Sequence, residues 1–425
     1  IQSPYSDEML AAIGNRIVYF ESSRGCPFSC SYCISSTYEG VRHFPVERIE
    51  RDLLKLINKG VKQIKFVDRT FNCSRTRAKE IFRFVAENPS DTNFHFEAAA
   101  DLFDEEMLDM LSKIPAGQIQ FEIGVQSTNP VTLDAISRKT DMEKVFHNIR
   151  RLMAMNNLHI HLDLIAGLPY EGSESFRKSF NDVYALRPHQ LQLGFLKLLK
   201  GSRIRRDALE HGYVYRDYPP YEVFCNKYLS YGEILEIKGV EELVERYFNS
   251  GRFAAIIAYA TANMFKSPYR FYLEFHTFYR ENGYAGKSIS SRELYTILLE
   301  FLGGIAGEEE NKLLNDIAKL DYLSSDSSNN LPYGIKRNVY SGFNDKCFDF
   351  LKNARKISAY LPGFQGMPAK QIYKHVHFEV FDYDVAGTCS KDGYIMRRTV
   401  ILFDYSRKNK VTGRFEYKRL DEFPI

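Results

Sequence analysis

Three cysteines, Cys26, Cys30 and Cys33, lie close together in the 425-residue chain, in the spacing C-x3-C-x2-C. Cysteine thiolates are soft ligands that hold iron–sulfur clusters well, and a cubane cluster normally takes one cysteine for each of its irons. Because no fourth cysteine lies nearby in the sequence, one iron of such a cluster would have no protein ligand. An iron with an open position can bind a substrate or a cofactor. The spacing therefore predicts a cluster that takes part in chemistry.

A structural zinc loop is the alternative for these cysteines. Zinc sites usually combine two C-x2-C or Cys/His pairs, and the sequence has no second pair. The other cysteines, Cys73, Cys225, Cys347 and Cys389, are scattered, which does not suit a disulfide framework. We therefore expect one cluster only, and a reducing cytoplasmic compartment.

Strand-like and helix-like segments alternate through the first half of the chain. Hydrophobic and β-branched patterns predict strands at residues 16–21, 61–67, 93–98, 118–125, 159–165 and 190–196. Amphipathic patterns predict helices between them, at residues 46–58, 75–87, 104–113, 142–156 and 173–186. This alternation indicates a parallel sheet with helices outside it, in which active-site groups lie at the carboxyl ends of the strands. The cysteines follow the first predicted strand, so we expect them at that edge.

Polar residues also end the next four predicted strands. The second strand leads into residues 68–72, the third ends at Glu97, the fourth leads into Gln126, and the fifth carries Asp163. Because the carboxyl ends of parallel strands meet at one edge of the sheet, we expect these residues to lie near the cysteines. Arg138 follows the fourth strand, and its planar guanidinium suits a carboxylate ligand because it can form two parallel bonds.

The cysteine motif, with Tyr32 directly before its last cysteine, resembles the signature of radical S-adenosylmethionine (SAM) enzymes. The G-V-Q…R pattern that ends at Arg138, and the D-L-I-A-G-L-P run that starts at Asp163, resemble oxygen-independent coproporphyrinogen oxidase and its relatives. The resemblance implies a [4Fe–4S] cluster on the three cysteines, with SAM bound to the open iron. It also implies an α/β fold with a partial (β/α)6 barrel of the TIM type.

The resemblance further implies which residues hold the carboxylate and ribose of SAM. Arg138 would grip the carboxylate, while Gln126 and Asp163 would meet the ribose. The carboxylate of Glu97 would accept hydrogen bonds from the ribose hydroxyls or from the SAM amine.

The amino group and the adenine of SAM would meet mainly backbone and small residues. Carbonyls around Thr70 and Phe71 would accept bonds from the amino group, in place of the glycine-rich edge of the family. Gly167 and Leu168 would line the adenine. The complete set of expected SAM contacts is Tyr32, Thr70, Phe71, Glu97, Gln126, Ser127, Arg138, Asp163, Gly167 and Leu168. We assign no catalytic residue.

The chain divides into a core and two further regions by pattern. We expect a radical SAM core over residues 15–205, a helical extension over 206–323 and a small α+β domain over 331–425. The sequence around the cysteines resembles radical SAM proteins whose N-terminal domain binds cobalamin, and the part after it resembles their C-terminal extension of unknown function. Residues 1–14 would then be a linker from an N-terminal domain that is missing from this sequence.

The expected function is reductive cleavage of SAM at the cluster, which starts radical chemistry on an unknown substrate. Methyl transfer with cobalamin is the leading reaction. A cobalamin-free radical oxidation, rearrangement or cyclisation is the alternative reaction. A SAM- and cluster-binding sensor or accessory protein without turnover is the alternative of another class.

The expected partners are a small-molecule or peptide substrate and a reducing electron donor, such as a flavodoxin or ferredoxin. The net charge of +3 gives no strong attraction to nucleic acid. The sequence contains no run of 18 apolar residues, so it predicts no membrane-spanning helix. The basic run at residues 197–206 carries no aromatic residue, unlike single-strand binders, so it reads as a solvated barrel rim.

Overall fold

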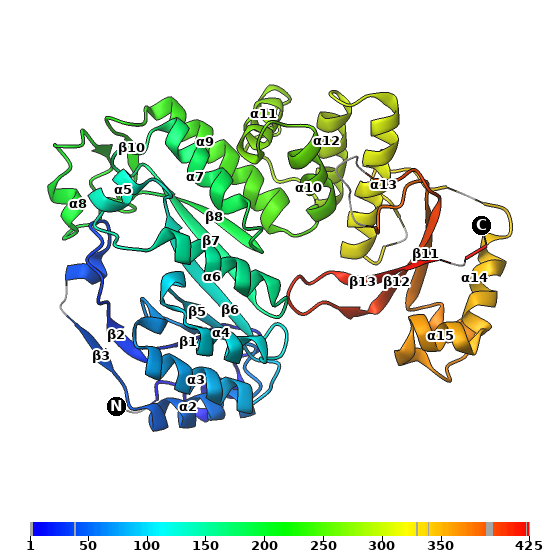
Figure 1. Ribbon diagram of the computed structural model, residues 1–425, viewed down its shortest axis with the longest axis horizontal. Coiled ribbons are helices and arrows are strands. Elements are labelled where there is room, and N and C mark those ends of the chain that lie inside the picture. Colours follow the sequence, from blue (N-terminus) through cyan, green and yellow to red (C-terminus); the bar gives the residue numbers. More distant parts are fainter. Residues whose placement is uncertain are drawn as a thin grey trace. The chain divides into compact units, whose positions relative to one another are not determined.

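The computed structural model of the protein describes residues 3–37, 40–328, 330–338, 340–387, 394–421 and 423–424. The chain forms two compact units, Ile1–Glu242 (unit 1) and Leu243–Ile425 (unit 2) (Figure 1). The domain boundaries expected from the sequence stay predictions. Within the described parts of the chain, none of the helices has the length and apolar character that a bilayer crossing requires.

Unit 1 is built on a six-stranded sheet in which every pair of neighbouring strands is parallel. The strands follow one another in the order of the sequence, and helices alternate with them, so the predicted partial (β/α)6 barrel is confirmed (Figure 1). Its strands are β1 (Val18–Phe20), β4 (Gln63–Phe66), β5 (Asn93–Glu97), β6 (Ile119–Gln126), β7 (His159–Ala166) and β8 (Gln190–Phe195).

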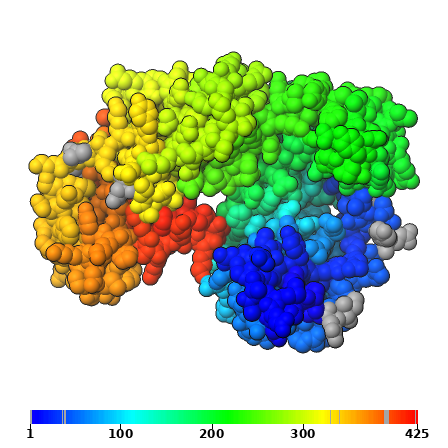
Figure 2. All heavy atoms as spheres, turned by 180° about the vertical axis from the view of Figure 1, so that it is seen from behind, coloured from blue at the N-terminus to red at the C-terminus, as the bar shows by residue number. Residues whose placement is uncertain are grey.

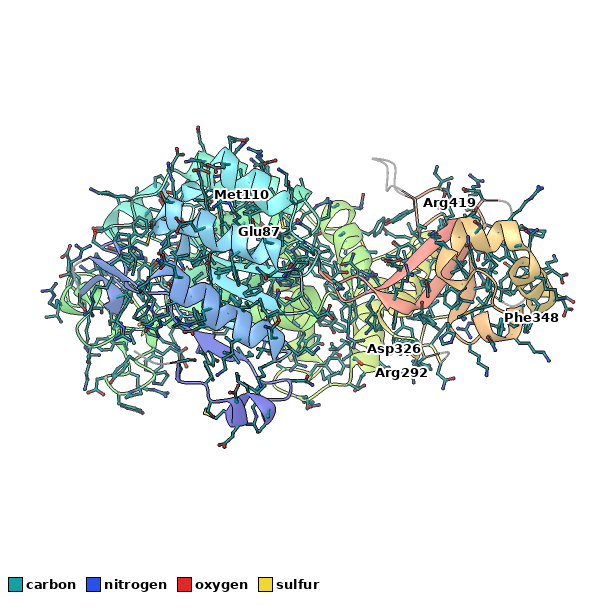
Figure 3. The ribbon with its side chains drawn as sticks, turned by 90° about the horizontal axis from the view of Figure 1, so that it is seen from below. Glu87, Met110, Arg292, Asp326, Phe348 and Arg419 are labelled. Carbon is teal, nitrogen blue, oxygen red and sulfur yellow. The ribbon has the colours of Figure 1, made fainter. Side chains whose placement is uncertain are left out.

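The helices of unit 1 each bury one apolar stripe. In α2 (Val46–Asn58), for example, Ile49, Leu53 and Leu56 are buried on one face, as the spacing of three to four residues requires. Helices α3 and α4 lie side by side; Figure 3 labels Glu87 at the end of α3 and Met110 on α4. The helices of unit 1 are α1 (Asp7–Ala11), α2, α3 (Arg75–Glu87), α4 (Glu105–Ser112), α5 (Pro130–Ala135), α6 (Met142–Ala154), α7 (Ser173–Tyr184), α8 (Arg203–Arg206) and α9 (Tyr231–Leu243), which reaches the division between the units.

Short elements fill the connections of unit 1. The first strand does not run directly into the cysteines as expected, because β2 (Ser23–Gly25) intervenes and pairs with β3 (Val41–His43). A second small pair is β9 (Val214–Tyr215) with β10 (Val223–Cys225). Three 3-10 turns complete the unit: Ile34–Thr37, Phe71–Cys73 and Ala100–Leu102.

Unit 2 combines helices with a three-stranded antiparallel sheet. The strands are β11 (Val376–Phe381), β12 (Thr399–Lys408) and β13 (Phe415–Leu420). The sheet lies in the region where the sequence predicts a small α+β domain. A π-helix, Val244–Asn249, opens the unit within the expected helical extension. The helices are α10 (Ala254–Asn263), α11 (Pro268–Glu281), α12 (Ser291–Gly303), α13 (Glu308–Ser325), α14 (Phe343–Lys352), α15 (Ala354–Tyr360) and α16 (Ala369–Ile372), with a 3-10 turn at Pro362–Phe364.

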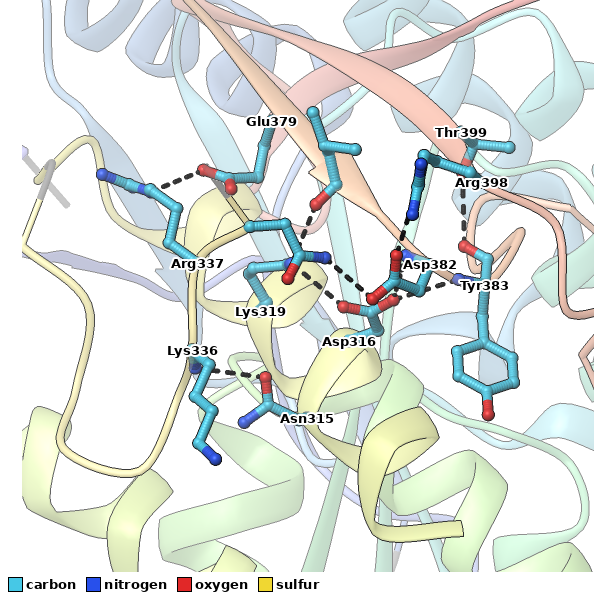
Figure 4. Close-up of polar contacts among 12 residues, drawn as sticks. Asn315, Asp316, Lys319, Lys336, Arg337, Glu379, Asp382, Tyr383, Arg398 and Thr399 are labelled. Atoms are coloured by element: carbon cyan, nitrogen blue, oxygen red, sulfur yellow. Dashed lines mark hydrogen bonds and ion pairs between the residues drawn. The ribbon is translucent and has the colours of Figure 1, made fainter. Parts of the chain in front are cut away.

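A buried ion pair ties α13 to β11 (Figure 4). The side chain of Lys319 is fully buried; its Nζ lies 2.9 Å from Asp316 Oδ1 and donates to the carbonyl of Val380 at 2.9 Å. Asp316 in turn accepts hydrogen bonds from the backbone N–H groups of Asp382 and Tyr383. Every partner of the buried cation is therefore supplied from within unit 2.

Candidate functional site

The three cysteines line one cavity of unit 1, at the carboxyl edge of the sheet. Cys26 directly follows β2, Cys30 is 7% exposed, and Cys26 and Cys33 are half-buried. Among the described residues, no three His, Cys, Asp or Glu side chains converge as the ligands of a single metal ion would. A cubane cluster, in which each cysteine binds a different iron, suits a set of three thiols at one cavity.

The backbone of the cysteine loop is fixed from both sides. The N–H of Ser31 donates to the carbonyl of Ile136 at 2.9 Å, and the N–H of Ile204 donates to the carbonyl of Ser31 at 3.0 Å. At the entry of the loop, the buried carboxylate of Asp68 accepts bonds from the N–H of Ser22 at 2.9 Å and from its hydroxyl at 2.7 Å. These bonds join the loop to the ends of β4, α5 and α8, so the position of the cysteines is set by distant parts of unit 1.

Arg138 connects the cysteine loop to β6. Its Nη1 lies 3.9 Å from Cys30 Sγ and 3.5 Å from the hydroxyl oxygen of Tyr32, while its Nη2 donates to the carbonyl of Gly124. Burial raises the pKa of Tyr32 above its ordinary value, so the phenol stays neutral. The buried Nε of Arg138 has no hydrogen-bond partner among the described residues. A donor of this kind fits an anionic ligand that the protein does not itself provide.

Gln126 is turned into the same cavity by an irregularity in β6. The register to β7 shifts between Gly124 and Gln126, and the φ angle of Gln126 is +72°, in the left-handed region. A Cβ atom on Gly124 would meet Gln126 Nε2 at 2.0 Å, so only glycine gives the amide this place. The buried Oε1 of Gln126 is a hydrogen-bond acceptor, and it also finds no partner within the described part of the chain.

A charged network crosses the inner face of the sheet below these residues. Glu122 Oε2 lies 3.1 Å from Lys65 Nζ and 3.0 Å from His95 Nε2, and these two contacts lower the pKa of Glu122 to about 2. Burial, aided by the negative charge of Glu122, raises the pKa of Glu97 to about 7. Burial also raises the pKa of Asp163, whose Oδ1 lies 3.0 Å from His161 Nε2. The cavity thus combines a fixed anion, Glu122, with a carboxyl that can gain or lose a proton near neutral pH, Glu97.

The structure brings most of the predicted SAM contacts together. The cavity is lined by nine of the predicted site residues, three of which are the cysteines; they are Cys26, Cys30, Tyr32, Cys33, Thr70, Glu97, Gln126, Arg138 and Asp163. They come from six segments, namely the cysteine loop, the connection after β4, the ends of β5 and β6, the loop after α5, and β7. Cys389 lies outside the described residues, and Cys73 does not line the cavity.

Four predicted contacts do not line the cavity. The ring of Phe71 packs against Phe66 and Phe96 in the core, so only its backbone is available for the expected bond. The hydroxyl of Ser127 donates to Glu171 at 2.6 Å. The carbonyl of Gly167 accepts from Tyr213 and Asn226, and the side chain of Leu168 is buried in an apolar cluster.

Sequence reasoning missed part of the cavity wall. Asp101, Glu122, Lys139 and Thr140 also line the cavity, together with Arg69 of the expected cluster at residues 68–72. A signal for Glu122 exists in the sequence, because Ile119–Gln126 reads I-Q-F-E-I-G-V-Q, with an apolar residue at every second position. In the structure those apolar residues are buried and the positions between them are half-buried. Glu122 therefore lies on the same face as Gly124 and Gln126, and a charge on the inner face of a parallel strand calls for a functional explanation.

Comparison with known proteins identifies this part of the chain. Residues 20–183 match the model of the radical SAM superfamily. This part of the chain is a radical SAM domain. Residues 209–403 match the family described as "Protein of unknown function (DUF4080)", so the expected extension of unknown function is also confirmed.

Curated relatives of the radical SAM domain include several methyltransferases. The cytidylyl-2-hydroxyethylphosphonate methyltransferase of Streptomyces wedmorensis is 25% identical over 225 residues, which cover 50% of this chain and 40% of that protein. The cobalamin-dependent radical SAM methyltransferase TokK of Streptomyces tokunonensis is 27% identical over 181 residues, which cover 40% of this chain and 26% of that protein. The chain therefore spans well under half the length of these relatives.

Among solved structures, the chain resembles the radical SAM methyltransferase TsrM of Kitasatospora setae, with cobalamin and a [4Fe–4S] cluster bound. The TM-score is 0.43 at 14% identity, over 74% of this chain and 58% of TsrM. The cobalamin-dependent SAM radical enzyme OxsB gives the same TM-score and identity, over 74% of this chain and 55% of OxsB.

Proposed function

We propose that this protein is a radical SAM enzyme that cleaves SAM reductively and methylates its substrate. The observation that carries the proposal is the convergence of all three cysteines with Arg138 at one cavity. Cys26, Cys30 and Cys33 would hold a [4Fe–4S] cluster, and SAM would occupy the cavity beside it. When bound, cluster and SAM together supply a 5′-deoxyadenosyl radical, and the protein's task is to bind, orient and shield.

The residues around the cavity divide this task. The guanidinium of Arg138, held in place by the carbonyl of Gly124, presents its Nε to the SAM carboxylate. The partnerless amide oxygen of Gln126 and the carboxylate of Asp163 accept bonds from hydroxyl groups of the ribose. Phe66, Phe96 and their aromatic neighbours do not line the cavity; they pack on the other face of β4 to β6 and support the strands that carry the site residues.

Methyl transfer is the reaction that the relatives favour, because those reported above are named as methyltransferases and one of them as cobalamin-dependent. Cobalamin would then be bound outside residues 1–425. The substrate, a small molecule or a peptide, would reach the open side of the cavity where Lys139 and Arg69 lie.

Anaerobic reconstitution of the complete protein with iron and sulfide, followed by dithionite and SAM, tests the proposal. We expect 5′-deoxyadenosine and a cobalamin absorbance, and S-adenosylhomocysteine once substrate is present. Formation of 5′-deoxyadenosine without S-adenosylhomocysteine would favour a cobalamin-free radical reaction. A cluster that binds SAM without cleaving it would instead indicate a sensor.

A further inference from the structure

The basic run of residues 197–206 is not a plain solvated rim, because aromatic residues from further along the chain stack against it. The guanidinium carbon of Arg205 lies 5.1 Å from the ring centre of Tyr215 and 5.3 Å from that of Tyr221. Arg216 lies 5.2 Å from Tyr218 in the same way. The stacking of aromatic rings on these arginines could not be predicted from the basic run itself, because the aromatic residues come after the run rather than within it.

This part of unit 1, residues 197–224, is called the basic face below. The basic face carries six basic and four acidic side chains, which is a net charge of +2 within this short stretch, whereas the whole chain has a net charge of only +3. Lys197, Lys200 and Arg206 are exposed. The side chain of Arg205 is held between the rings of Tyr215 and Tyr221, and its Nη1 donates a 2.7 Å hydrogen bond to the carbonyl of Leu198. The face therefore presents positive charge on a rigid frame.

Exposed apolar side chains accompany these charges. Leu209 is 95% exposed and Tyr218 is 61% exposed. Arginine and aromatic residues are the side chains enriched in protein–protein interfaces. Residues 197–224 are among the green spheres of Figure 2. Charge and composition together suit an acidic protein partner.

The basic face is joined to the cysteine loop by direct bonds. The N–H of Ile204, in the middle of the basic run, donates to the carbonyl of Ser31, which lies between Cys30 and Cys33. Arg203 donates to the hydroxyl of Ser137, next to Arg138. Ile204 also shares an apolar cluster with Tyr32. A protein docked on this face is therefore held within a few residues of the three cysteines.

We propose that the basic face is the docking site of an acidic electron-carrier protein that reduces the cluster. The inference rests on the proposed function, which requires one electron for each SAM cleaved. A flavodoxin in its hydroquinone form would give up one electron and become the semiquinone, and the [4Fe–4S] cluster held by the cysteines would take up that electron. Electron-transfer complexes are commonly small and weak, and opposite charges mainly raise their association rate. A short basic face next to the cysteine loop suits such a small, weak complex with an acidic partner.

The test compares two reductants on the same variants. The triple variant K197E/R206E/K200E reverses three exposed charges that lie outside the SAM cavity. The control K62E/R83E/R150E makes the same change in net charge at exposed positions outside the basic face. With an acidic flavodoxin as donor, we expect the apparent KM for flavodoxin to rise at least about 10-fold in the first variant and to stay within about 2-fold in the control. With dithionite, both variants should form 5′-deoxyadenosine at the rate of the parent protein.

Added salt provides a second measurement that needs no variant. The rate with flavodoxin should fall as ionic strength rises, while the rate with dithionite should change little. An unchanged KM for flavodoxin in K197E/R206E/K200E would overturn the docking site. The docking site would also be overturned if that variant lost binding to a single-stranded RNA probe while its KM for flavodoxin stayed unchanged. The face would then bind nucleic acid. Absence of 5′-deoxyadenosine with dithionite in the parent protein would overturn the proposed function and this inference with it.

Discussion

The guanidinium of Arg138 lies 3.9 Å from the thiol sulfur of Cys30, although 108 positions separate the two residues in the chain. The contact joins the loop that would hold the cluster to the residue that would hold the carboxylate of SAM. The contact therefore couples the position of the cysteine loop to the position of the arginine that is proposed to bind the carboxylate.

The planar fork of Arg138 is expected to be essential for SAM affinity. Arg138→Lys keeps the charge but loses the unpartnered Nε–H and the planar group whose Nη atoms contact Tyr32 and Gly124, so SAM should bind about 10-fold more weakly, and Arg138→Ala about 100-fold more weakly. Equilibrium dialysis of the reconstituted protein with labelled SAM measures both. Arg150→Ala, at an exposed position of α6, is the control and should bind SAM normally. Normal affinity in Arg138→Ala would remove Arg138 from the SAM site.

Three cysteines rather than four are expected to hold the cluster. Cys30→Ala should abolish the brown absorbance and most of the bound iron and sulfide after anaerobic reconstitution. Cys73→Ala is the informative control, because Cys73 lies at the end of the turn after β4 but outside the cavity. It should keep the full cluster. Loss of iron from the Cys73 variant would add a fourth ligand and contradict an open iron.

Gly124 is expected to matter through the side chain of Gln126. A methyl group at position 124 would displace the amide, whose Nε2 lies 2.0 Å from the place of the new carbon. Because a flexible side-chain end can move, Gly124→Ala should fold normally and yet weaken SAM binding. Gln126→Ala should weaken it by a similar factor, and the double variant should be no worse than either single variant. Additive losses would show that Gly124 acts independently of Gln126.

Glu171 is expected to make the stability of the protein depend on pH. Burial raises the pKa of this carboxyl from its ordinary value of 4.5 to about 7. The folded chain therefore holds the proton more tightly, and stability is lost as the pH rises from about 4.5 to about 7. Between pH 4.5 and pH 8, the free energy of unfolding of Glu171→Gln should gain on the order of 3 kcal/mol relative to the parent protein. Urea unfolding measures this, and the exposed Glu174→Gln should show no such trend.

The buried cation of unit 2 should contribute strongly to stability. Lys319→Met leaves the carboxylate of Asp316 buried without its counter-charge, which costs about 3–5 kcal/mol in comparable pairs. The control Lys336→Met removes an exposed lysine and should change the free energy of unfolding by less than about 0.5 kcal/mol. Denaturant unfolding followed by far-UV circular dichroism distinguishes the two. Equal effects would mean that the ion pair does not stabilise the fold.

Amphipathic spacing was sufficient to predict much of unit 1. The helices Val46–Asn58 and Arg75–Glu87 have the predicted bounds, because their buried residues recur every three to four positions and polar residues cover the outer face. The rule that active-site groups follow parallel strands led correctly to Glu97, Gln126 and Asp163 at the cavity.

Side-chain contacts that depend on the register of neighbouring strands could not be predicted from the sequence. The contacts of Glu122 with Lys65 and His95 follow from the register of three strands, which no local pattern contains. In the same way, the hydroxyl of Ser127 turns toward Glu171 because a neighbouring loop offers a buried acceptor there. The strand β13 was not predicted because only Leu420 of its six residues is buried, so it lacks a clear alternation.

The two backbone bonds of Ser31 bear on how the protein matures during synthesis. Cys30 and Cys33 leave the ribosome early, but the loop between them is clamped by Ile136 and Ile204, which follow much later. The thiols can reach their final arrangement only once the chain through α8 has folded. A cluster on these cysteines would therefore be inserted only after the polypeptide through Arg206 has been synthesised.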